Sequence, residues 1–581
     1  MRLGRRLLDA LRSPRRLVAF LRRVAQVAWR GELGPLLTRV RPRGPTADEY
    51  RAWRSLQPAQ DASPGMTPVI IALDAGNHAS YDGFKATVER SGAHNALVVV
   101  RAGRTGWAPL EGGAARSLAD WSVDRGASWI WWIATALQLA PGANAAMARG
   151  CSVPGARIVY ADHEVHDVHG DLAPVFKSAW DRIQLLERPY PAPFLAVRAD
   201  FSSAIENAGE TGIAGQWRFL LDAIENAPAS AVVHVPRVVA QLAFNAMGSS
   251  DDARDRGTVS PSITRIVESG GVRADTSPSR TPWLRLRVES PCPVSVVIPT
   301  RDHPALLERC LRALIAEKFP QDAEVVVVDN GSSDPRVAQL LQRTGLRVTL
   351  NVVSMPGPFN FPALCNAGVA AARGRVVVLL NNDTEVGSGW LAELASLAAY
   401  DGIGAVGPLL LYPDGMVQSA GVLLGVNRTA TSALAGFDAD DPVVRAWCTS
   451  RRRVSAVLGA CLAVSRERYV HAGGMDESFG VSHNELDFCL RLEADGLANV
   501  FTPFARVVHE EGGTRGFELT GAERQRLDAE ERLFLARWGH VLETADPAHH
   551  PALARTGNPF SLASGVADAR PRSGWRAAAA R

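Results

Sequence analysis

Short apolar runs, separated by longer segments of mixed polarity, recur in two parts of the chain. The runs lie at 69–73, 96–100, 128–133 and 157–160 in the first part, and at 294–298, 324–328 and 375–380 in the second. Runs of this length that are rich in Val and Ile are typical of strands buried on both faces of a sheet. Between them, apolar residues repeat at helical spacing, as over 305–316 and 364–373. Strands that alternate with helices predict an α/β fold, here two doubly wound, mostly parallel sheets in tandem.

Less regular segments flank and separate these two parts of the 581-residue chain. Residues 247–292 are rich in Ser, Asp, Arg, Gly and Pro, which is typical of a linker. Beyond residue 540 the sequence is dominated by Pro, His, Ala and Arg, so we expect 541–581 to be a disordered tail. The pattern therefore predicts one α/β domain over 66–246 and a second over 293–540.

Residues 1–45 form a basic arm, with twelve arginines against only Asp9 and Glu32. At about 100° per residue, the stretch 15–30 places its apolar side chains on one side and its arginines on the other. Such a helix can lie on an anionic membrane surface, where each Arg contributes about 1 kcal/mol. The alternative is a helix docked on its own domain with a solvated basic face. We favour membrane contact, because like charges this dense need a partner or water.

Composition narrows the class of protein. Hydrophobic residues make up 46% and charged residues 21%, the balance of a globular chain. The net charge of +3 is small, so we expect no nucleic-acid partner. Seven cysteines without a CxxC pair indicate neither a zinc ribbon nor a disulfide framework, and a reducing compartment fits them best. No signal peptide and no apolar run of about 18 residues is found, so we expect a cytoplasmic protein, peripheral to the inner membrane face if the arm binds lipid.

Polar residues follow three strands of the second domain at the point where each strand ends. They are the segments Pro299-Thr-Arg-Asp302, Asp329-Asn-Gly-Ser-Ser-Asp334 and Asn381-Asn-Asp-Thr-Glu385. Ligands of doubly wound sheets bind at the carboxyl ends of the strands, where these side chains should meet. Carboxylate oxygens such as those of Asp383 suit Mg²⁺ or Mn²⁺. The second segment, taken alone, is equally a turn with helix-capping residues.

The three segments in this order resemble the family 2 glycosyltransferases, which have a GT-A fold and transfer sugars from nucleotide donors with inversion. The resemblance covers about 293–520, and Pro358–Gly368 looks like the segment found in O-antigen and rhamnan-type transferases. It implies that Asp383 is the direct metal ligand and Asn381 a weaker helper. The residues that it places on the nucleotide-sugar are Pro299, Arg301, Asp329, Gly331, Ser332, Asn366, Asn381, Asn382 and Arg515.

Two downstream motifs extend the resemblance. The stretch Asn484–Arg491 resembles the family's acidic motif, whose first acid is the general base. That position is Glu485, where Asp is commoner, and Asp487 either acts with it or positions Glu485 or the acceptor. In Val508–Gly516 the resemblance implies that His509 is a second metal ligand and that Arg515 contacts the diphosphate. The implied mechanism is direct displacement: Glu485 takes the acceptor's hydroxyl proton as that oxygen attacks the anomeric carbon.

The first domain resembles the same fold without its acids. Residues 157–167 and 174–180 look like a stretch of related transferase domains, but Ala134, Thr135 and Ala136 stand at the metal-binding positions. Gln216 and Arg218 stand where the acidic motif should be. Neutral side chains cannot hold Mg²⁺ or accept a proton, so we predict a pseudo-transferase that serves as scaffold or acceptor-binding surface. Nearby His163, Glu164, His166, Asp167 and His169 match no standard metal motif.

The sequence thus predicts two GT-A-like domains in tandem, of which the C-terminal one is catalytic. We expect an inverting glycosyltransferase that moves a sugar from a nucleotide-diphosphate donor to a growing surface polysaccharide or lipid-linked glycan, with Mg²⁺ or Mn²⁺. A nucleotidyltransferase is one alternative, but it needs a Gly-rich, basic first loop, which Pro299–His303 is not. The other is a catalytically inactive glycan-binding or assembly protein.

Overall fold

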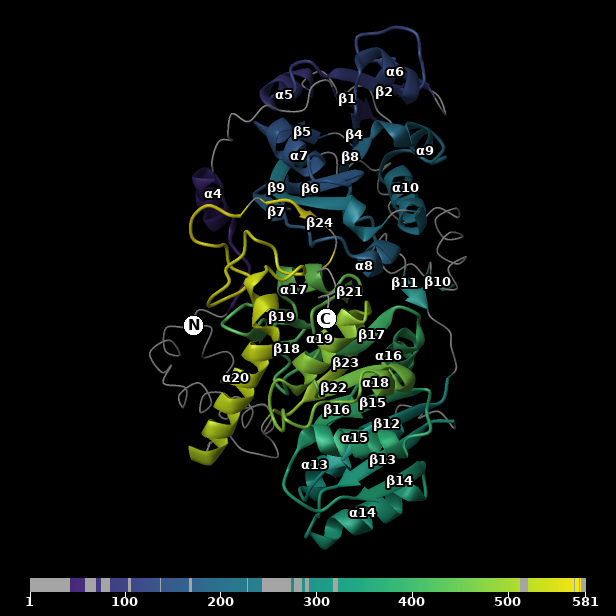
Figure 1. Cartoon of the computed structure of the whole chain (residues 1–581), viewed down its shortest axis with the longest axis vertical. Coiled ribbons are helices and arrows are strands. Elements are labelled where there is room, and N and C mark those ends of the chain that lie inside the picture. Colours follow the sequence, from purple (N-terminus) through teal and green to yellow (C-terminus); the bar gives the residue numbers. More distant parts are fainter. Residues whose placement is uncertain are drawn as a thin grey trace.

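Two ten-stranded sheets organise the computed structural model of this chain, one above the other in Figure 1. The described residues are 42–57, 69–74, 84–102, 106–135, 137–166, 170–226, 228–242, 273–275, 285–287, 292–316, 322–511, 521–568, 570–573 and 575. The basic arm therefore lies outside them except for 42–45. Most of the 247–292 linker does too, although β10 (Arg273–Asp275) and β11 (Arg285–Arg287) form an antiparallel pair. Among the described helices, none combines the length and apolar character needed to span a bilayer.

The C-terminal sheet has a parallel half and a mixed half, in the order β14-β13-β12-β15-β22-β17-β23-β16. The first four strands are mutually parallel, β22 runs antiparallel to both of its neighbours, and β17 and β23 are parallel. The strands are β12 (Val294–Thr300), β13 (Glu324–Asp329), β14 (Thr349–Ser354), β15 (Val376–Leu380), β16 (Thr384–Val386), β17 (Ile403–Leu411), β18 (Val417–Ser419), β21 (Arg452–Arg453), β22 (Cys461–Ser465) and β23 (Ala498–His509). The principal helices are α13 (Pro304–Ala316), α14 (Pro335–Gly345), α15 (Phe361–Ala371), α16 (Trp390–Ala399), α19 (Asn484–Ala494) and α20 (Gly521–Glu543).

The N-terminal sheet repeats this topology. Its strands β2-β1-β4-β8-β6-β9 pair with the same directions as β13-β12-β15-β22-β17-β23. Short strands β5 and β7 join it as β16 and β18 join the other sheet. The strands are β1 (Ile70–Leu73), β2 (Leu97–Ala102), β3 (Gly106–Pro109), β4 (Trp129–Ile133), β5 (Leu137–Leu139), β6 (Ile158–His166), β7 (Leu172–Val175), β8 (Phe194–Arg198) and β9 (Val232–Leu242). Its principal helices are α4 (Ala47–Leu56), α5 (Phe84–Arg90), α6 (Leu118–Arg125), α7 (Ala143–Cys151), α8 (Arg182–Glu187) and α10 (Gly212–Asn226). The predicted tandem of α/β sheets is confirmed.

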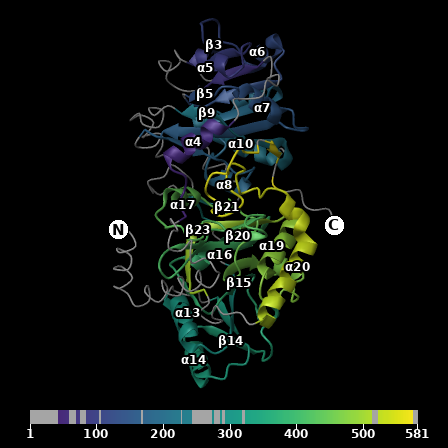
Figure 2. The same ribbon diagram turned by 90° about the vertical axis from the view of Figure 1, so that its left-hand side faces the viewer.

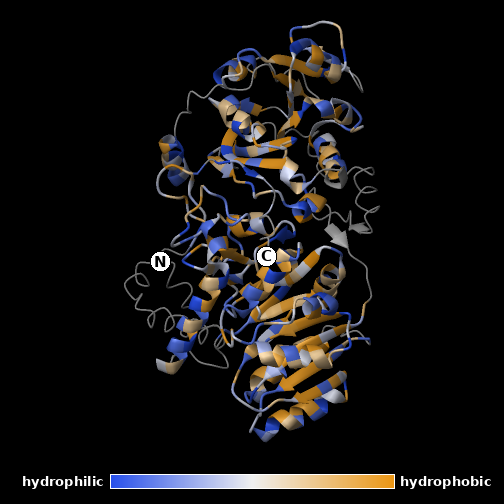
Figure 3. Cartoon of the chain, viewed as in Figure 1, coloured by the Kyte–Doolittle hydropathy of each residue, from blue (hydrophilic) through white to orange (hydrophobic). Residues whose placement is uncertain are grey.

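Both faces of each sheet are buried, as the continuous apolar runs require. Along β12, Val297 packs into one apolar cluster, whereas Val296 and Ile298 pack into the cluster on the opposite face. Alternate side chains of a strand point to opposite faces, so a strand covered on both sides reads as uninterrupted Val and Ile. Figure 3 shows this directly, with orange strands beneath helices that carry both colours.

The prediction of a disordered tail is wrong for the described residues after 540. The chain leaves α20, crosses from the C-terminal unit to the N-terminal one, and adds β24 (Arg572–Ser573) to β9 (Figure 2). Asp546 anchors the start of the tail by accepting hydrogen bonds from the Leu424 backbone at 2.7 Å and the Ser455 hydroxyl at 2.6 Å. The tail is held by specific polar contacts, which leave no periodic apolar pattern in the sequence. Its composition alone therefore suggested disorder.

A buried ion cluster joins the two units. The guanidinium of Arg451 lies between Glu187 of α8 and Glu393 of α16, and Nε is 2.7 Å from Glu393 Oε1. Arg451 is only 2% exposed. Asp181 also accepts a hydrogen bond from the Arg453 backbone at 2.8 Å. Since breaking a buried pair leaves an uncompensated charge, these contacts hold the units in one arrangement.

Candidate active site

The loop after β13 is built around the carboxylate of Asp329. Its Oδ1 accepts hydrogen bonds from the Ser332 backbone at 2.9 Å and the Ser332 hydroxyl at 2.6 Å. Gly331 has φ of 80°, and a Cβ there would lie 3.1 Å from Pro356, so only glycine fits the turn. Asp329 remains half-buried at the strand end. The carboxylate therefore orders this loop, and its contact with a nucleotide-sugar stays a prediction.

Asp383 and His509 lie next to each other where β16 pairs with β23. Antiparallel pairing of Thr384 in β16 with His509 in β23 brings the two together across 126 residues of chain. His509 Nε2 lies 3.2 Å from Asp383 Oδ1, and both residues are buried. Asn381, at the end of β15, adds its Nδ2 at 3.3 Å from the same His509 nitrogen. The predicted metal ligands and helper are therefore neighbours.

The tautomer of His509 decides what this pair can hold. Gln418 Oε1, an atom that can only accept, lies 2.9 Å from His509 Nδ1, so Nδ1 carries the hydrogen. In the neutral ring, the lone pair of Nε2 then faces Asp383 Oδ1, which is buried without a hydrogen-bond partner. A cation between these two atoms, either a proton on Nε2 or a metal ion, would remove their repulsion. A neutral His whose other nitrogen donates to an acceptor, next to a carboxylate, is the usual donor set for a divalent metal.

Glu485 occupies the first turn of α19, where the positive end of the helix dipole favours a carboxylate. The backbone beside it is Gly459, whose missing side chain would lie 3.7 Å from the Glu485 Cβ and 3.4 Å from Phe361. The adjacent Ala460 accepts a hydrogen bond from the Asn381 backbone at 3.0 Å. The 459–460 segment thus links the Glu485 turn to the strand end that carries Asn381 and Asp383.

Asp487 does not share this position. It is fully buried, and its oxygens accept from Arg491 Nε at 2.9 Å, Arg537 Nη1 at 2.7 Å and Trp538 Nε1 at 2.9 Å. A carboxylate engaged in this way is inaccessible to an acceptor, so of the predicted roles only positioning of the Glu485 helix remains. Its partners on α20 lie 50 residues downstream, where no sequence motif pointed to them.

Two asparagines expected at the nucleotide-sugar are instead used within the fold. Asn366 Oδ1 accepts from the Tyr469 hydroxyl at 2.6 Å and the Met475 backbone at 3.0 Å, while its Nδ2 donates to the Met475 carbonyl at 2.9 Å. Asn382 is buried and donates to the Thr300 hydroxyl at 2.9 Å. The Asn366 amide, with both its oxygen and its nitrogen engaged, holds α15 to the 469–475 segment, whereas Asn382 joins the ends of β15 and β12.

The remaining predicted residues differ in their exposure. Pro299 is buried within β12, whereas Arg301, directly after that strand, is exposed at the edge of the site. Arg515 falls in 512–520, outside the described residues. Sequence reasoning missed Gln418, whose Oε1 contacts His509 Nδ1 from β18, and Arg309, which forms an ion pair with Glu510, the residue after His509. Neither belongs to a motif, and only the strand pairing could have identified them.

The corresponding region of the N-terminal unit is closed by its own side chains. Asp74, after β1, pairs with Arg101 Nε at 2.6 Å and accepts from Trp132 Nε1 at 3.2 Å. Burial raises the pKa of Asp74, although Arg101 opposes the shift. Gln216 is fully buried and donates to the carbonyls of Trp132 and Pro193 at 2.8 and 3.2 Å. Ala134 follows β4 as Asn381 follows β15, and it brings no polar side chain.

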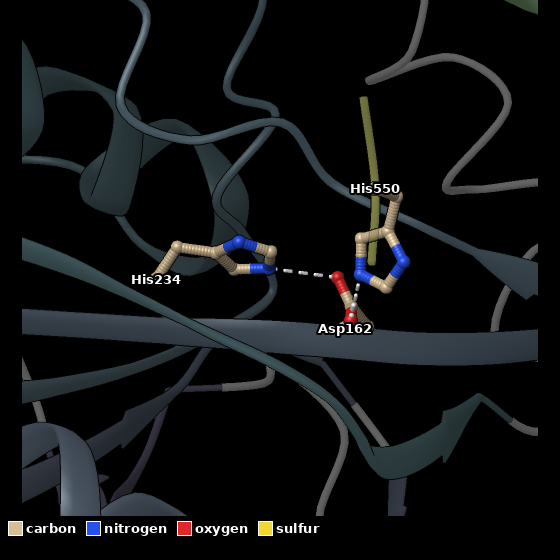
Figure 4. Close-up of side chains that lie close together, drawn as sticks. All are labelled: Asp162, His234 and His550. Atoms are coloured by element: carbon tan, nitrogen blue, oxygen red, sulfur yellow. Dashed lines mark hydrogen bonds and ion pairs between the residues drawn. The ribbon is translucent and has the colours of Figure 1, made fainter. Parts of the chain in front are cut away.

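A second cluster with metal-binding residue types lies in the N-terminal unit, at Asp162, His234 and His550 (Figure 4). Asp162 lies 2.9 Å from His234 Nε2 and 2.8 Å from His550 Nε2. Here, however, His550 Nδ1 accepts a hydrogen bond from the Ala552 backbone at 3.0 Å, so Nε2 carries the hydrogen and donates it to Asp162. The cluster is therefore a hydrogen-bonded bridge between β6, β9 and the tail, in contrast to the Asp383 and His509 pair.

The sequence of this chain is similar to those of several known proteins. The model of the family "Glycosyl transferase family 2" matches residues 295–447. Protein y4gI of Sinorhizobium fredii is 37% identical over 274 residues, 47% of this chain and 30% of that protein. O-antigen biosynthesis protein RfbC of Myxococcus xanthus is 29% identical over 419 residues, 70% of this chain and 33% of that protein. The chain thus spans about a third of the length of these two relatives.

A third relative covers the C-terminal part. It is the N-acetylglucosaminyl-diphospho-decaprenol L-rhamnosyltransferase of Mycobacterium tuberculosis, 28% identical over 238 residues. Those residues are 36% of this chain and 73% of that protein.

Proposed function

We propose that this chain transfers a sugar from a nucleotide-diphosphate donor to a glycan hydroxyl, with inversion at the anomeric carbon. The proposal starts from the match of residues 295–447 to the family 2 glycosyltransferase model. The catalytic domain in this proposal is 293–540, and 66–246 is its non-catalytic companion. The observation that carries the proposal is the approach of His509 Nε2 to 3.2 Å from Asp383 Oδ1 at a strand end.

Asp383 and His509 would hold Mg²⁺ or Mn²⁺, with Asn381 beside them. Such an ion supplies positive charge to the diphosphate leaving group as its bond to the sugar breaks. The rest of the proposed chemistry belongs to the chain itself. Asp329 and the Ser332 turn would bind the nucleoside, and the exposed Arg301 would bind the donor at the same edge of the sheet.

Glu485 is the proposed general base. The acceptor's hydroxyl oxygen forms a bond to the anomeric carbon, the bond from that carbon to the diphosphate oxygen breaks, and the hydroxyl proton passes to Glu485. The nucleoside diphosphate leaves with the electron pair of the broken bond. Because attack and departure occur on opposite faces, the anomeric configuration inverts. Gly459 packs next to Glu485, so a larger side chain at this position would press against the proposed base.

The N-terminal unit is proposed to act as a scaffold. Its Asp74–Arg101 pair, at the ends of β1 and β2, and the buried Gln216 of α10 occupy the region that corresponds to the active site. The Arg451 cluster joins it to α16, the helix that follows the metal-binding strand end. A pseudo-transferase held in this way would stabilise the catalytic unit or extend its acceptor surface.

The acceptor is proposed to be a growing surface polysaccharide or a lipid-linked glycan at the cytoplasmic face of the membrane. Two relatives support this class, one named for O-antigen biosynthesis and one for rhamnosyl transfer to a diphospho-decaprenol glycan. Membrane contact through residues 1–45 is part of the proposal and rests on their charge pattern alone.

The test is a donor panel of UDP-, GDP- and dTDP-sugars, with Mn²⁺ or Mg²⁺, scored by release of nucleoside diphosphate from the full-length chain. We expect release that requires the cation and falls by a factor on the order of 100 in Asp383→Asn. The matched control is Asp440→Asn, an exposed aspartate of the same unit, which should match the parent. Activity that survives in a double variant lacking Asp383 and Glu485 would rule out the proposed site.

A further inference from the structure

A cavity in the N-terminal unit lies apart from the proposed active site and is lined by three arginines. Arg54 comes from α4, Arg149 from α7 and Arg237 from β9, and Trp53, Phe176 and His550 complete the main part of the wall. The three arginines are half-buried. Elements from both ends of the described chain build the rim, because α4 and the tail pack together against β7 (Figure 1).

A β-bulge creates this cavity. In the pairing of β6 with β9, Ala161 lies opposite Val235 and the next residue, Asp162, lies opposite Val238. Pro236 and Arg237 are therefore looped out of the ladder, and Arg237 is turned into the cavity wall. Bulges redirect side chains in this way and are common beside functional sites.

The acidic groups near the cavity are already engaged. Asp162, at the floor, accepts hydrogen bonds from both His234 and His550. Glu164 accepts from the buried Tyr50 hydroxyl at 2.6 Å and lies 3.5 Å from Arg54 Nε. Among the described residues named here, three arginines line the cavity or its rim against the two carboxylates of Asp162 and Glu164.

The duplicated topology offers an internal comparison. The C-terminal unit has a bulge at the equivalent place, three residues long instead of two, because Pro408 lies opposite Thr502 and Leu409 opposite Arg506. There α16, which corresponds to α7, presents the acidic Glu393, and that site is filled by the Arg451 guanidinium, which stacks 5.1 Å from the Phe504 ring. In the N-terminal unit the charges are reversed, because α7 and the bulge themselves carry the arginines. Because a cation occupies the acidic site of the C-terminal unit, we expect an anion at the basic site of the N-terminal unit.

We propose that this cavity binds the phosphoryl or pyrophosphoryl group of a ligand. Planar guanidinium groups match the oxygens of a phosphate with paired hydrogen bonds, and three of them from separate elements suit a multiply charged tetrahedral group. The cavity measures about 40 Å³, room for roughly three waters, so it admits the phosphate and leaves the rest of the ligand at the mouth. This inference does not depend on the proposed transferase activity.

The first experiment measures pyrophosphate binding to the full-length chain by calorimetry in EDTA, which prevents metal-dependent binding at Asp383. We expect Arg149→Gln and Arg237→Gln each to weaken binding roughly tenfold. Arg218→Gln, an arginine of α10 outside the cavity, and Asp383→Asn should bind like the parent. Equal binding by all four variants, or loss of binding only in Asp383→Asn, would overturn the proposal.

The second experiment needs no variant and so does not depend on the variants' folding. In the parent protein, pyrophosphate should protect Arg149 and Arg237, but not Arg218, from phenylglyoxal, as read by peptide mass spectrometry. Unchanged modification of Arg149 and Arg237 would contradict the site. Parallel titrations with inorganic phosphate, a nucleoside diphosphate and farnesyl diphosphate then identify the source, because only a lipid-linked ligand makes the farnesyl compound the tightest binder.

Discussion

His509 donates its Nδ1 hydrogen to Gln418 Oε1, 2.9 Å away, and its other ring nitrogen, Nε2, lies 3.2 Å from Asp383 Oδ1. Gln418 is itself oriented, because its Nε2 lies 3.4 Å from Glu511 Oε2 and can donate to it. The ring is therefore set in one tautomer by the fold before any metal binds. A residue without metal-ligand chemistry of its own thus decides whether the histidine can serve as a ligand.

Replacing Gln418 with Leu should weaken Mn²⁺ binding about 10- to 100-fold, because the acceptor that holds the hydrogen on Nδ1 is lost. Binding can be measured by titration of the free Mn²⁺ signal in electron paramagnetic resonance. Gln418→Glu keeps an acceptor at this position and should retain most of the affinity. Equal affinity in the Leu variant and the parent would show that Gln418 does not position His509.

Glu485→Gln should lower kcat by about 10² to 10⁴, the usual contribution of a positioned base, while donor affinity and thermal stability stay near those of the parent. The side chain keeps its size and its place at the first turn of α19, so only proton acceptance is lost. Turnover and the midpoint of thermal unfolding are the measurements. An exposed glutamate of the same unit, changed in Glu467→Gln, is the control. Full activity in Glu485→Gln would assign the base elsewhere.

Asp487→Ala should show the opposite pattern to Glu485→Gln. Removing the carboxylate leaves Arg491, Arg537 and Trp538 without their shared acceptor, and we expect a loss of about 3 kcal/mol in the free energy of unfolding. Urea denaturation measures the loss. The folded fraction should retain acceptor affinity, since Asp487 is buried away from it. A stable variant with selectively weakened acceptor binding would restore Asp487 to the acceptor site.

The bridge of Asp162 to two histidines predicts a pH dependence of stability. Burial lowers the pKa of His234 from 6.5 to about 4, although Asp162 opposes this shift. Between these values the unfolded chain binds a proton that the folded chain does not, so stability falls as the pH falls. The expected contribution is about 2 kcal/mol lost between pH 7 and pH 5.

Comparison with His234→Gln isolates this contribution, because the other titrating groups remain in both proteins. Urea denaturation of parent and variant at pH 7 and pH 5 should show a shallower pH dependence in the variant. Identical slopes would mean that His234 does not titrate across this window. His166→Gln, a more exposed histidine at the end of β6, serves as the control for general effects of losing an imidazole.

The buried strands and the strand-end motifs were predictable, because both leave a local signal. The apolar run that contains Val296 and Ile298 indicates a buried strand from the local sequence alone. In the same way, Asp329 followed by Gly331 indicates a tight turn. Asn366 and Asn382 were assigned to the ligand because a polar residue in a motif looks the same whether it binds a sugar or a backbone carbonyl. The tail was misjudged because Asp546 and His550 are held by partners more than 90 residues away.

The sequence by itself determined that this chain has two α/β units, that acids cluster at the strand ends of the second, and that the first has lost them. These properties depend on residues close together in the chain, where periodicity and motif order can be read. Only the tertiary structure decided that Asn366 and Asp487 are held within the fold, that His509 lies against both Gln418 and Asp383, and that Arg54, Arg149 and Arg237 line one cavity. Each of these depends on strand pairing, a β-bulge or a docked tail, which bring together side chains separated by tens to hundreds of residues.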